Sequence, residues 1–257
     1  MKLLAIGISI CMASLLAHEA RGVTNQQNCD FARITAWKTY FACIESAVAK
    51  DAKFLVFDDF AAVARCRHAY LKKWNGFQTP RHRPFLVGST CIGTRFVDNA
   101  DQTVTDNLTM LVWEKKDNRD GMPNSSDPHD ADNKYYWGLS IEDGTAFSDF
   151  LANLNSSGFA GANGWRLPTM PELATIVLDF ACRGEGSAPS CTCPTYPCID
   201  PALDANNTVS GNYYSATGYL PDPNLVWSVD FGLGDVGGSN GPGKASGALV
   251  RAVRGGL

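Results

Sequence analysis

The residues of this sequence that could hold a metal ion are carboxylates in two stretches. Calcium is a hard cation that prefers oxygen ligands, and Asp98, Asp101 and Asp106 lie close together in one of them. The second stretch is the acidic loop 127–132, which also contains His129. Neither has the alternating oxygen ligands and central glycine of an EF-hand loop. We therefore expect no cofactor, interpret the acidic loop as solvated, and keep Asp98, Asp101 and Asp106 as candidate calcium ligands.

A late segment carries the candidate ligand contacts. Asp222-Pro223-Asn224, followed by Trp227 and Asp230, is similar to the Glu-Pro-Asn and Trp-Asn-Asp elements that hold calcium and sugar in C-type lectins. The two elements lie much closer together here, so we interpret them as a turn. Aromatic rings can stack on sugars, and we expect Tyr135, Tyr213, Tyr214 and Tyr219 to be exposed because they flank loops. The candidate ligand contacts are Tyr214, Tyr219, Asp222, Asn224 and Asp230.

One glycine-rich segment matches the pattern of a catalytic serine. Gly237-Gly238-Ser239-Asn240-Gly241 resembles a nucleophile elbow, which requires a strand before the serine and a helix after it. Pro242 and Gly243 follow, and they disfavour a helix. His129 is the only histidine in the C-terminal two thirds of the chain. We therefore expect neither a Ser-His-Asp hydrolase nor any other enzymatic activity.

The cysteines predict disulfides. Cys11 lies in the N-terminal apolar run, and the other eight form two groups of four separated by ninety residues. In an exported chain an even count favours bridges, and Cys-x-Cys is not a usual zinc spacing. We expect Cys43–Cys66 and Cys29–Cys91 bridges, and two more among the last four, whose pairing stays open, although Cys191–Cys193 is disfavoured. The last four are Cys182, Cys191, Cys193 and Cys198.

The N-terminus has the charged, apolar, small-residue order of a secretory signal peptide, with Lys2, an apolar run over 3–16, and Arg21-Gly22. A lipoprotein signal ending at Cys11 is the alternative, disfavoured by the bulky Ile10. Of 22 basic and 26 acidic residues the signal carries two and one, which leaves a net charge of −5. This argues against nucleic-acid binding. We expect no transmembrane segment in the mature chain, because no later apolar run is long enough.

Two helices should follow the signal peptide. Apolar residues at three- and four-residue spacing predict an amphipathic helix from 29 to 48. A second helix should begin at Asp58 or Asp59, bury Phe60, Val63 and Tyr70, and end near Gly76. A turn near residue 53 brings Cys43 close to Cys66. Prolines make 79–84 an extended basic linker. The apolar residues of the first helix are Phe31, Ile34, Trp37, Phe41, Ile44 and Val48.

The remainder of the chain reads as an α+β domain. Short β-prone runs predict strands at 94–97, 103–106, 110–114, 213–216, 225–231 and 248–254. A helix over 145–155 should end at Gly158. Thr169 and Glu172 form a capping box that begins another helix. We expect Trp113, Trp165 and Trp227 to be core residues.

Six segments in this domain together resemble the Lcl C-terminal domain family, also known as domain of unknown function 1566, over about residues 93–257. The resemblance implies a bacterial envelope or secreted protein with a C-type-lectin-like fold, in which the first and last strands pair and two helices flank a small twisted sheet. At least one member of the family looks like an adhesion module that binds sulfated polysaccharide as a trimer. The first turn departs from the family, with Ala100 and Gln102 where glycines are usual. The segments are 95–99, 103–109, 112–115, 164–169 with 172–173, 227–231 and 250–256.

The sequence therefore predicts a signal peptide (1–22), an α-helical hairpin (23–78), a linker (79–92) and a C-type-lectin-like domain (93–257). We expect an exported binding or adhesion module that recognises polysaccharide through the loops 214–224 and 232–247. The alternative is an envelope structural or protein-interaction domain with a protein ligand and no sugar. In either case the chain could form a homo-oligomer. A remote alternative is an oxidase similar to the formylglycine-generating enzymes, which requires free, reactive thiols.

Overall fold

The structure is a computed structural model that describes residues 25–54, 59–78, 95–139, 141–177, 197–237 and 242–256. The predicted signal peptide, the 79–92 linker, the Cys29–Cys91 bridge, and Cys182, Cys191 and Cys193 lie outside the described residues. No helix in the described ranges has the length and apolar character needed to span a membrane.

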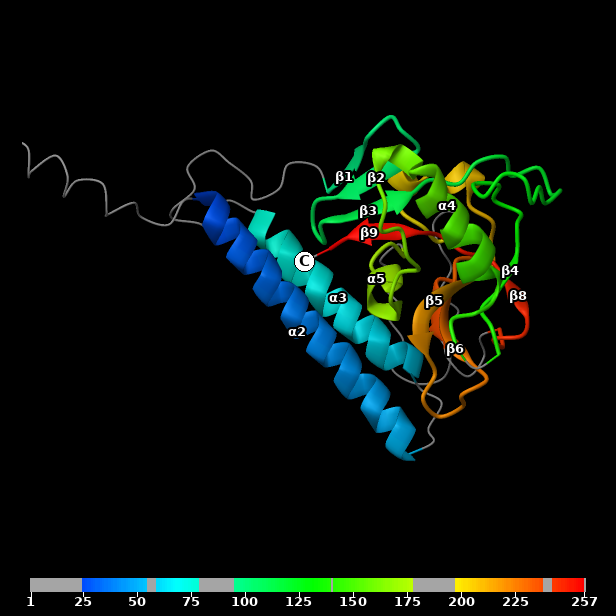
Figure 1. The fold of residues 1–257 in the computed structure, drawn as a ribbon. Helices are drawn as coiled ribbons and strands as arrows, with labels where there is room; N and C mark the ends of the chain where they lie inside the picture. Colours follow the sequence, from blue (N-terminus) through cyan, green and yellow to red (C-terminus); the bar gives the residue numbers. More distant parts are fainter. Residues whose placement is uncertain are drawn as a thin grey trace, which may run out of the picture.

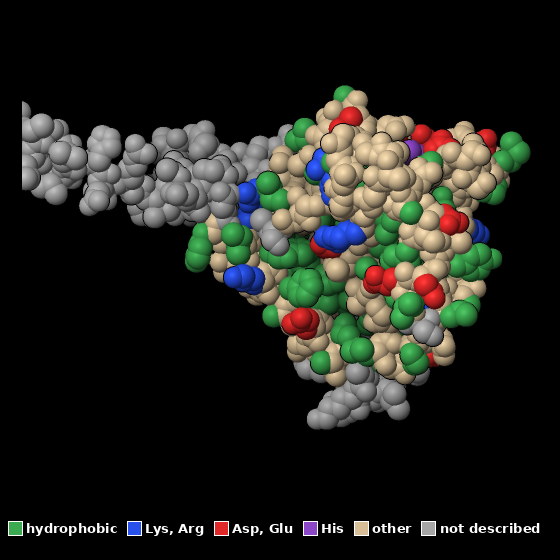
Figure 2. Space-filling model, in the orientation of Figure 1, with side chains coloured by type: hydrophobic (Ala, Val, Ile, Leu, Met, Phe, Trp, Pro, Cys, Tyr) green, Lys and Arg blue, Asp and Glu red, His purple; other side chains and the backbone are tan. Residues whose placement is uncertain are grey.

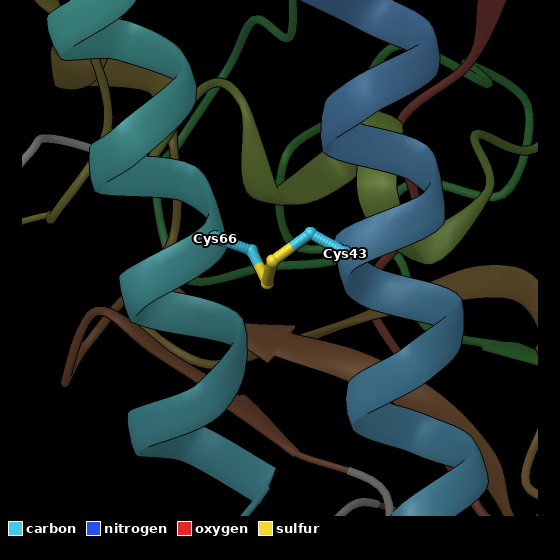
Figure 3. The surroundings of a disulfide bond; sticks show 2 residues. All are labelled: Cys43 and Cys66. Atoms are coloured by element: carbon cyan, nitrogen blue, oxygen red, sulfur yellow. A yellow bond between two sulfur atoms is a disulfide. The ribbon is translucent and has the colours of Figure 1, made fainter.

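The predicted helical hairpin is present. Helix α2 (Asn25–Phe54) and helix α3 (Asp59–Gln78) lie side by side along one flank of the sheets (Figure 1). Both helices are longer than predicted, and α3 continues past Gly76. The Cys43–Cys66 disulfide joins them with the two Cα atoms 5.7 Å apart (Figure 3), which confirms that bridge.

The face that α2 buries is offset from its most apolar stripe. The buried residues recur at three- and four-residue spacing and include the small Ala36 and Ala47. By contrast, Phe31 is 72% exposed and Ile34 is 39% exposed, so the stripe seen in the sequence is only partly covered. The two alanines let α2 approach its neighbours closely, between larger side chains that reach into the core. The buried residues are Arg33, Ala36, Tyr40, Ile44 and Ala47.

The hairpin shares a hydrophobic core with the sheets. Val63 and Tyr70 of α3 belong to the same buried cluster as Phe96 and Leu173 of the C-terminal region. Polar contacts cross the same boundary: the Tyr40 hydroxyl donates to the Pro171 carbonyl at 3.0 Å. The Arg33 guanidinium also donates to the Asn107 carbonyl at 2.9 Å. The helices thus form part of the core of the folded unit.

The C-terminal region is a mixed α/β structure with small antiparallel sheets. The largest has the strand order β1-β2-β3-β9. The strands β2 (Thr103–Asp106) and β3 (Leu111–Glu114) agree with the sequence prediction to within one residue, and β1 (Phe96–Asp98) is displaced from the predicted 94–97. The last strand, β9 (Val253–Gly255), pairs with β3 and leaves β1 at the sheet edge. The implied pairing of the first and last strands is therefore wrong for this chain.

The turn between β1 and β2 is strained at two positions. Ala100 and Gln102 have φ values of 60° and 64°, in the left-handed region that favours glycine. The resemblance described in the sequence analysis implies glycine at these two positions. The Asp98 carboxylate partly compensates by accepting a hydrogen bond from the Ala100 amide at 2.9 Å.

Two smaller sheets complete the fold. One joins β5 (Asn212–Gly218), β6 (Val226–Asp230) and β7 (Asp235–Gly237), and the other pairs β4 (Tyr135–Tyr136) with β8 (Gly247–Ala248). The sequence did not predict β4 or β7. The predicted strand 248–254 divides into β8 and β9, because the fully buried Arg251 lies between them and donates to the carbonyl oxygens of Glu114 and Leu203.

The helices of this region are short. The predicted helix 145–155 comprises a π-helical turn η3 (Ala146–Leu151) and α4 (Ala152–Ser157), and Gly158 ends it at φ 63° as expected. Helix α5 (Met170–Ala174) begins at the capping box, where the Thr169 amide donates to the Glu172 carboxylate at 2.8 Å. Trp113, Trp165 and Trp227 are buried, as predicted. Single 3-10 turns are η4 (Phe159–Gly161), η5 (Pro201–Leu203) and η6 (Ala205–Asn207).

Candidate ligand-binding site

A polar hollow of about 380 Å³ opens between η3–α4 and the loop that precedes β4. Ser148 and Asp149 come from η3, and Asn153 and Ser156 from α4. Tyr135 of β4 supplies an aromatic wall. Hydroxyl, amide and carboxylate groups around an aromatic ring can form hydrogen bonds to a polyhydroxylated ligand and pack against its apolar face. Ser125 and Ala152 complete the lining.

The inner face of η3–α4 fixes the orientation of these polar side chains. Phe150 and Leu154 are fully buried on one face, whereas Ser148, Asp149, Asn153 and Ser156 lie on the exposed face. The Phe150 ring lies 5.2 Å from the Tyr135 ring, centroid to centroid, and anchors the aromatic wall. Ser148 donates to the Asp149 carboxylate at 2.8 Å, which orients one acceptor at the rim. The hollow therefore rests on a packed base.

The loop on the other side is held by its own side chains. The Asn133 amide group donates to the carbonyl oxygens of Asn124 and Asp127 at 2.9 and 2.7 Å. The Asp127 carboxylate accepts from the His129 amide, and the buried Asp130 carboxylate accepts from the amide of Asp132 and the side chain of Asn118. The acidic side chains of this loop thus stabilise its turns.

A buried ionic cluster fastens that loop to the sheet. The Glu114 carboxylate, fully buried at the end of β3, contacts Lys116 Nζ and His129 Nδ1 at 2.9 Å each, and accepts from the Ala252 amide at 2.9 Å. Burial alone would raise the pKa of Glu114, but Lys116 and His129 outweigh it and hold that pKa below its ordinary value. Lys116 also donates to the Pro128 carbonyl at 3.0 Å, which ties the cluster to the loop.

A family model, described as the Lcl C-terminal domain, matches residues 102–254, which is more than half of the chain. The chain belongs to the Lcl C-terminal domain family. Neither the curated proteins nor the solved structures gave a match.

The segments that carry the resemblance to the Lcl C-terminal domain supply contacts that stabilise the fold. Trp113 and Glu114 lie on β3, and Glu114 holds the ionic cluster. The Arg166 guanidinium binds the Glu172 carboxylate through two contacts of 2.7 Å and ties the 164–169 segment to α5. None of the residues that line the hollow falls within those segments. In this chain, therefore, the Lcl motifs stabilise the fold and other residues provide the polar surface.

The predicted exposure of the late tyrosines is wrong. Tyr214 is fully buried, and its hydroxyl contacts the carbonyl oxygens of Gly243 and Ser246. Tyr219 is 6% exposed and packs edge-on against Trp227. The neighbouring loops fold back over the two tyrosine rings. The position of these tyrosines next to loops in the sequence did not indicate that burial. Tyr213 is also buried, and Tyr135 is mostly buried with an edge at the hollow.

The other late candidates stabilise turns. Asp222 accepts from the amide and the side chain of Asn224 at 2.9 and 3.1 Å, and Asp230 accepts from the Gly232 amide at 2.6 Å. The structure does not gather Tyr214, Tyr219, Asp222, Asn224 and Asp230 around a described hollow. Their role as ligand contacts stays a prediction.

The candidate calcium ligands are likewise separate. The Asp98 carboxylate binds Lys115 at 2.8 Å, and Asp101 accepts from the Thr103 amide at 3.1 Å. Asp106 is buried and receives two hydrogen bonds from Arg95, at 3.1 and 3.0 Å. Within the described ranges, no three His, Cys, Asp or Glu side chains form a group suited to a metal ion.

Sequence reasoning missed Ser148, Asp149, Asn153 and Ser156 because they look like the solvated face of any surface helix. The available signal was the helix itself: once Phe150 and Leu154 are placed inward, these residues must face outward together.

Proposed function

We propose that this chain is an exported bacterial binding module whose polar hollow receives a neutral glycan on a C-type-lectin-like scaffold. The observation that carries the proposal is the set of outward hydroxyl, amide and carboxylate groups around the Tyr135 edge, above a packed base. No described Lys or Arg lines the hollow, and Asp149 contributes a negative charge. A lining with one negative charge and no described positive charge favours a neutral sugar over a sulfated one.

Two observations support export. Cys43 and Cys66 are bridged, and Cys198 is also disulfide-bonded. Disulfides persist in oxidising compartments, in agreement with the signal-like N-terminus. Bonded cysteines also count against the oxidase alternative, and thiol titration of the native and the denatured chain tests that alternative directly.

A glycan array probed with the mature chain tests the proposal. We expect binding to a neutral glycan, and Asp149→Ala/Asn153→Ala should weaken it at least about tenfold, the cost of losing a charged and a neutral hydrogen bond. Glu142→Ala is the matched control, because Glu142 is an exposed carboxylate of the preceding bend outside the hollow. The absence of binding to any glycan on the array, or an equal loss of glycan binding in the control variant, would overturn the proposal.

Calcium should not be needed. Asp98, Asp101 and Asp106 each already accept hydrogen bonds from protein donors. We therefore expect the chelator EDTA to change neither glycan binding nor the melting temperature. A fall in either that added calcium reverses would contradict this expectation.

A further inference from the structure

Helix α2 presents apolar surface on a second face, away from the core. The first face is covered by α3 and the sheets through Tyr40, which stacks on Tyr70 with ring centroids 4.7 Å apart. On the second face Phe31 is 72% exposed and Ile34 is 39% exposed. Figure 2 shows a band of hydrophobic side chains over this helix, interrupted by isolated charged ones. A helix that is apolar on two faces is suited to two partners, and the fold supplies one.

The second face is also hollowed. A groove of about 400 Å³ runs along it between aromatic side chains and two opposite charges. Its walls are firm: the Trp37 ring lies 5.5 Å from that of Tyr40 and 5.8 Å from that of Tyr70, so the groove is supported by the hairpin core. The lining residues are Ile34, Trp37, Lys38, Phe41, Ala42 and Glu45.

The charge pattern of this groove is self-complementary, so that two copies of the groove could pair. Lys38 and Glu45 are seven residues apart, so they lie on the same face about two turns, or about 10 Å, from each other. If a second copy packs antiparallel about a two-fold axis between Phe41 and Ala42, each Lys38 lies opposite the other copy's Glu45. Such an interface satisfies both charges twice, as an isologous contact requires.

The sizes of the side chains fit the same axis. Ala42, a small exposed residue, lies at the crossing point and lets the two helices approach closely. Ile34 then lies opposite Ala49 of the other copy, so a large exposed side chain meets a small one. The same register that pairs the charges therefore also relieves crowding.

We propose that the outer face of α2 is a homodimer interface, in which two copies pack antiparallel through the groove and exchange Lys38–Glu45 ion pairs. The charge pattern favours this occupant over a lipid surface, because membrane-lying helices carry mostly basic residues on the polar face. The interface lies on a different element from the polar hollow and does not depend on the proposed glycan.

Sedimentation velocity of the mature, oxidised chain tests the interface over about a hundredfold range of concentration. We expect a concentration-dependent dimer. Lys38→Glu and Glu45→Lys should each raise its dissociation constant about tenfold, because each reversal places like charges together twice. The double variant Lys38→Glu/Glu45→Lys should restore wild-type dimerisation, a recovery that a folding defect would not give.

Two further variants complete the design. Ile34→Asp should abolish the dimer, while Lys72→Glu, the same charge change on an exposed residue of α3, should leave it unchanged. A monomer at every concentration would overturn the proposal, as would a dimer that is indifferent to Ile34→Asp or a double variant no better than the singles. Binding of monomer to phosphatidylglycerol vesicles, lost in Ile34→Asp, would assign the face to lipid instead.

Discussion

Lys115 and Lys116 are neighbours in the sequence with opposite environments. Lys116 is 3% exposed and faces the fully buried Glu114, whereas Lys115 pairs with the largely exposed Asp98. Lys116→Met should cost about 3–5 kcal/mol of unfolding free energy, because it leaves a buried carboxylate without its main counter-charge. Lys115→Met, the matched control, should cost at most about 1 kcal/mol. Urea unfolding measures both, and equal costs would contradict the assignment of the cluster.

The β1–β2 turn offers a stabilising substitution. Ala100 holds a left-handed φ of 60°, which costs an alanine about 1–2 kcal/mol. Ala100→Gly should therefore raise the unfolding free energy by about 0.5–1 kcal/mol, after the added freedom of glycine in the unfolded chain. Ala49→Gly, in the exposed face of α2, should lower it by about 1 kcal/mol. A lower unfolding free energy in both variants would show that the left-handed φ of Ala100 does not destabilise the turn.

Local signals in the sequence predicted the residues that they determine directly. Glu172 returns to the Thr169 amide, and Gly158 ends its helix in the left-handed conformation, because each effect needs only neighbouring residues. The exposure of Tyr214 and Tyr219 depends on how distant loops fold back, which no local pattern encodes. The candidate site was missed for the same reason, since its two sides come from separate segments.

Among the elements, the helical hairpin is the one joined by a described disulfide. The Cys43–Cys66 disulfide spans a sequence separation of 23 residues, and closing a loop of this size stabilises a fold by about 3 kcal/mol on a chain-entropy model. Cys43→Ala/Cys66→Ala should lower the unfolding free energy by about that amount in denaturant titration. Ser46→Ala, a neighbouring exposed change on α2, should have an effect within about 0.5 kcal/mol. An unchanged denaturation midpoint in the double variant would show that packing alone stabilises the hairpin.

The same element shows where periodicity misleads. The spacing of Phe31, Ile34, Trp37 and Phe41 correctly predicted a helix, but the helix buries Ala36, Tyr40 and Ile44 most deeply. Hydrophobicity alone ranks the large stripe first, whereas packing against α3 and the sheets decides which face is buried. The stripe that remains outside is the basis of the proposed dimer.

In the folded chain as a whole, the helical hairpin shares a hydrophobic cluster with the sheets. Residues 93–257 produced alone would lose the hairpin side of the cluster that contains Phe96 and Leu173. We expect this fragment to have a lower melting temperature and a lower solubility than the full mature chain, because newly exposed apolar area costs roughly 25 cal/mol per Å². Near-ultraviolet circular dichroism during heating checks this. A fragment as stable as the whole would show that the hairpin is an independent module.

The proposed function requires that the hollow beside Tyr135 bind the ligand. Backbone amide shifts of the isotope-labelled mature chain, titrated with a glycan selected on the array, test it most directly. We expect saturable shifts concentrated at the residues that line the hollow, which are 125, 135, 148, 149, 152, 153 and 156. Saturable shifts confined to the loops 214–224 and 232–247, with none along η3–α4, would contradict it.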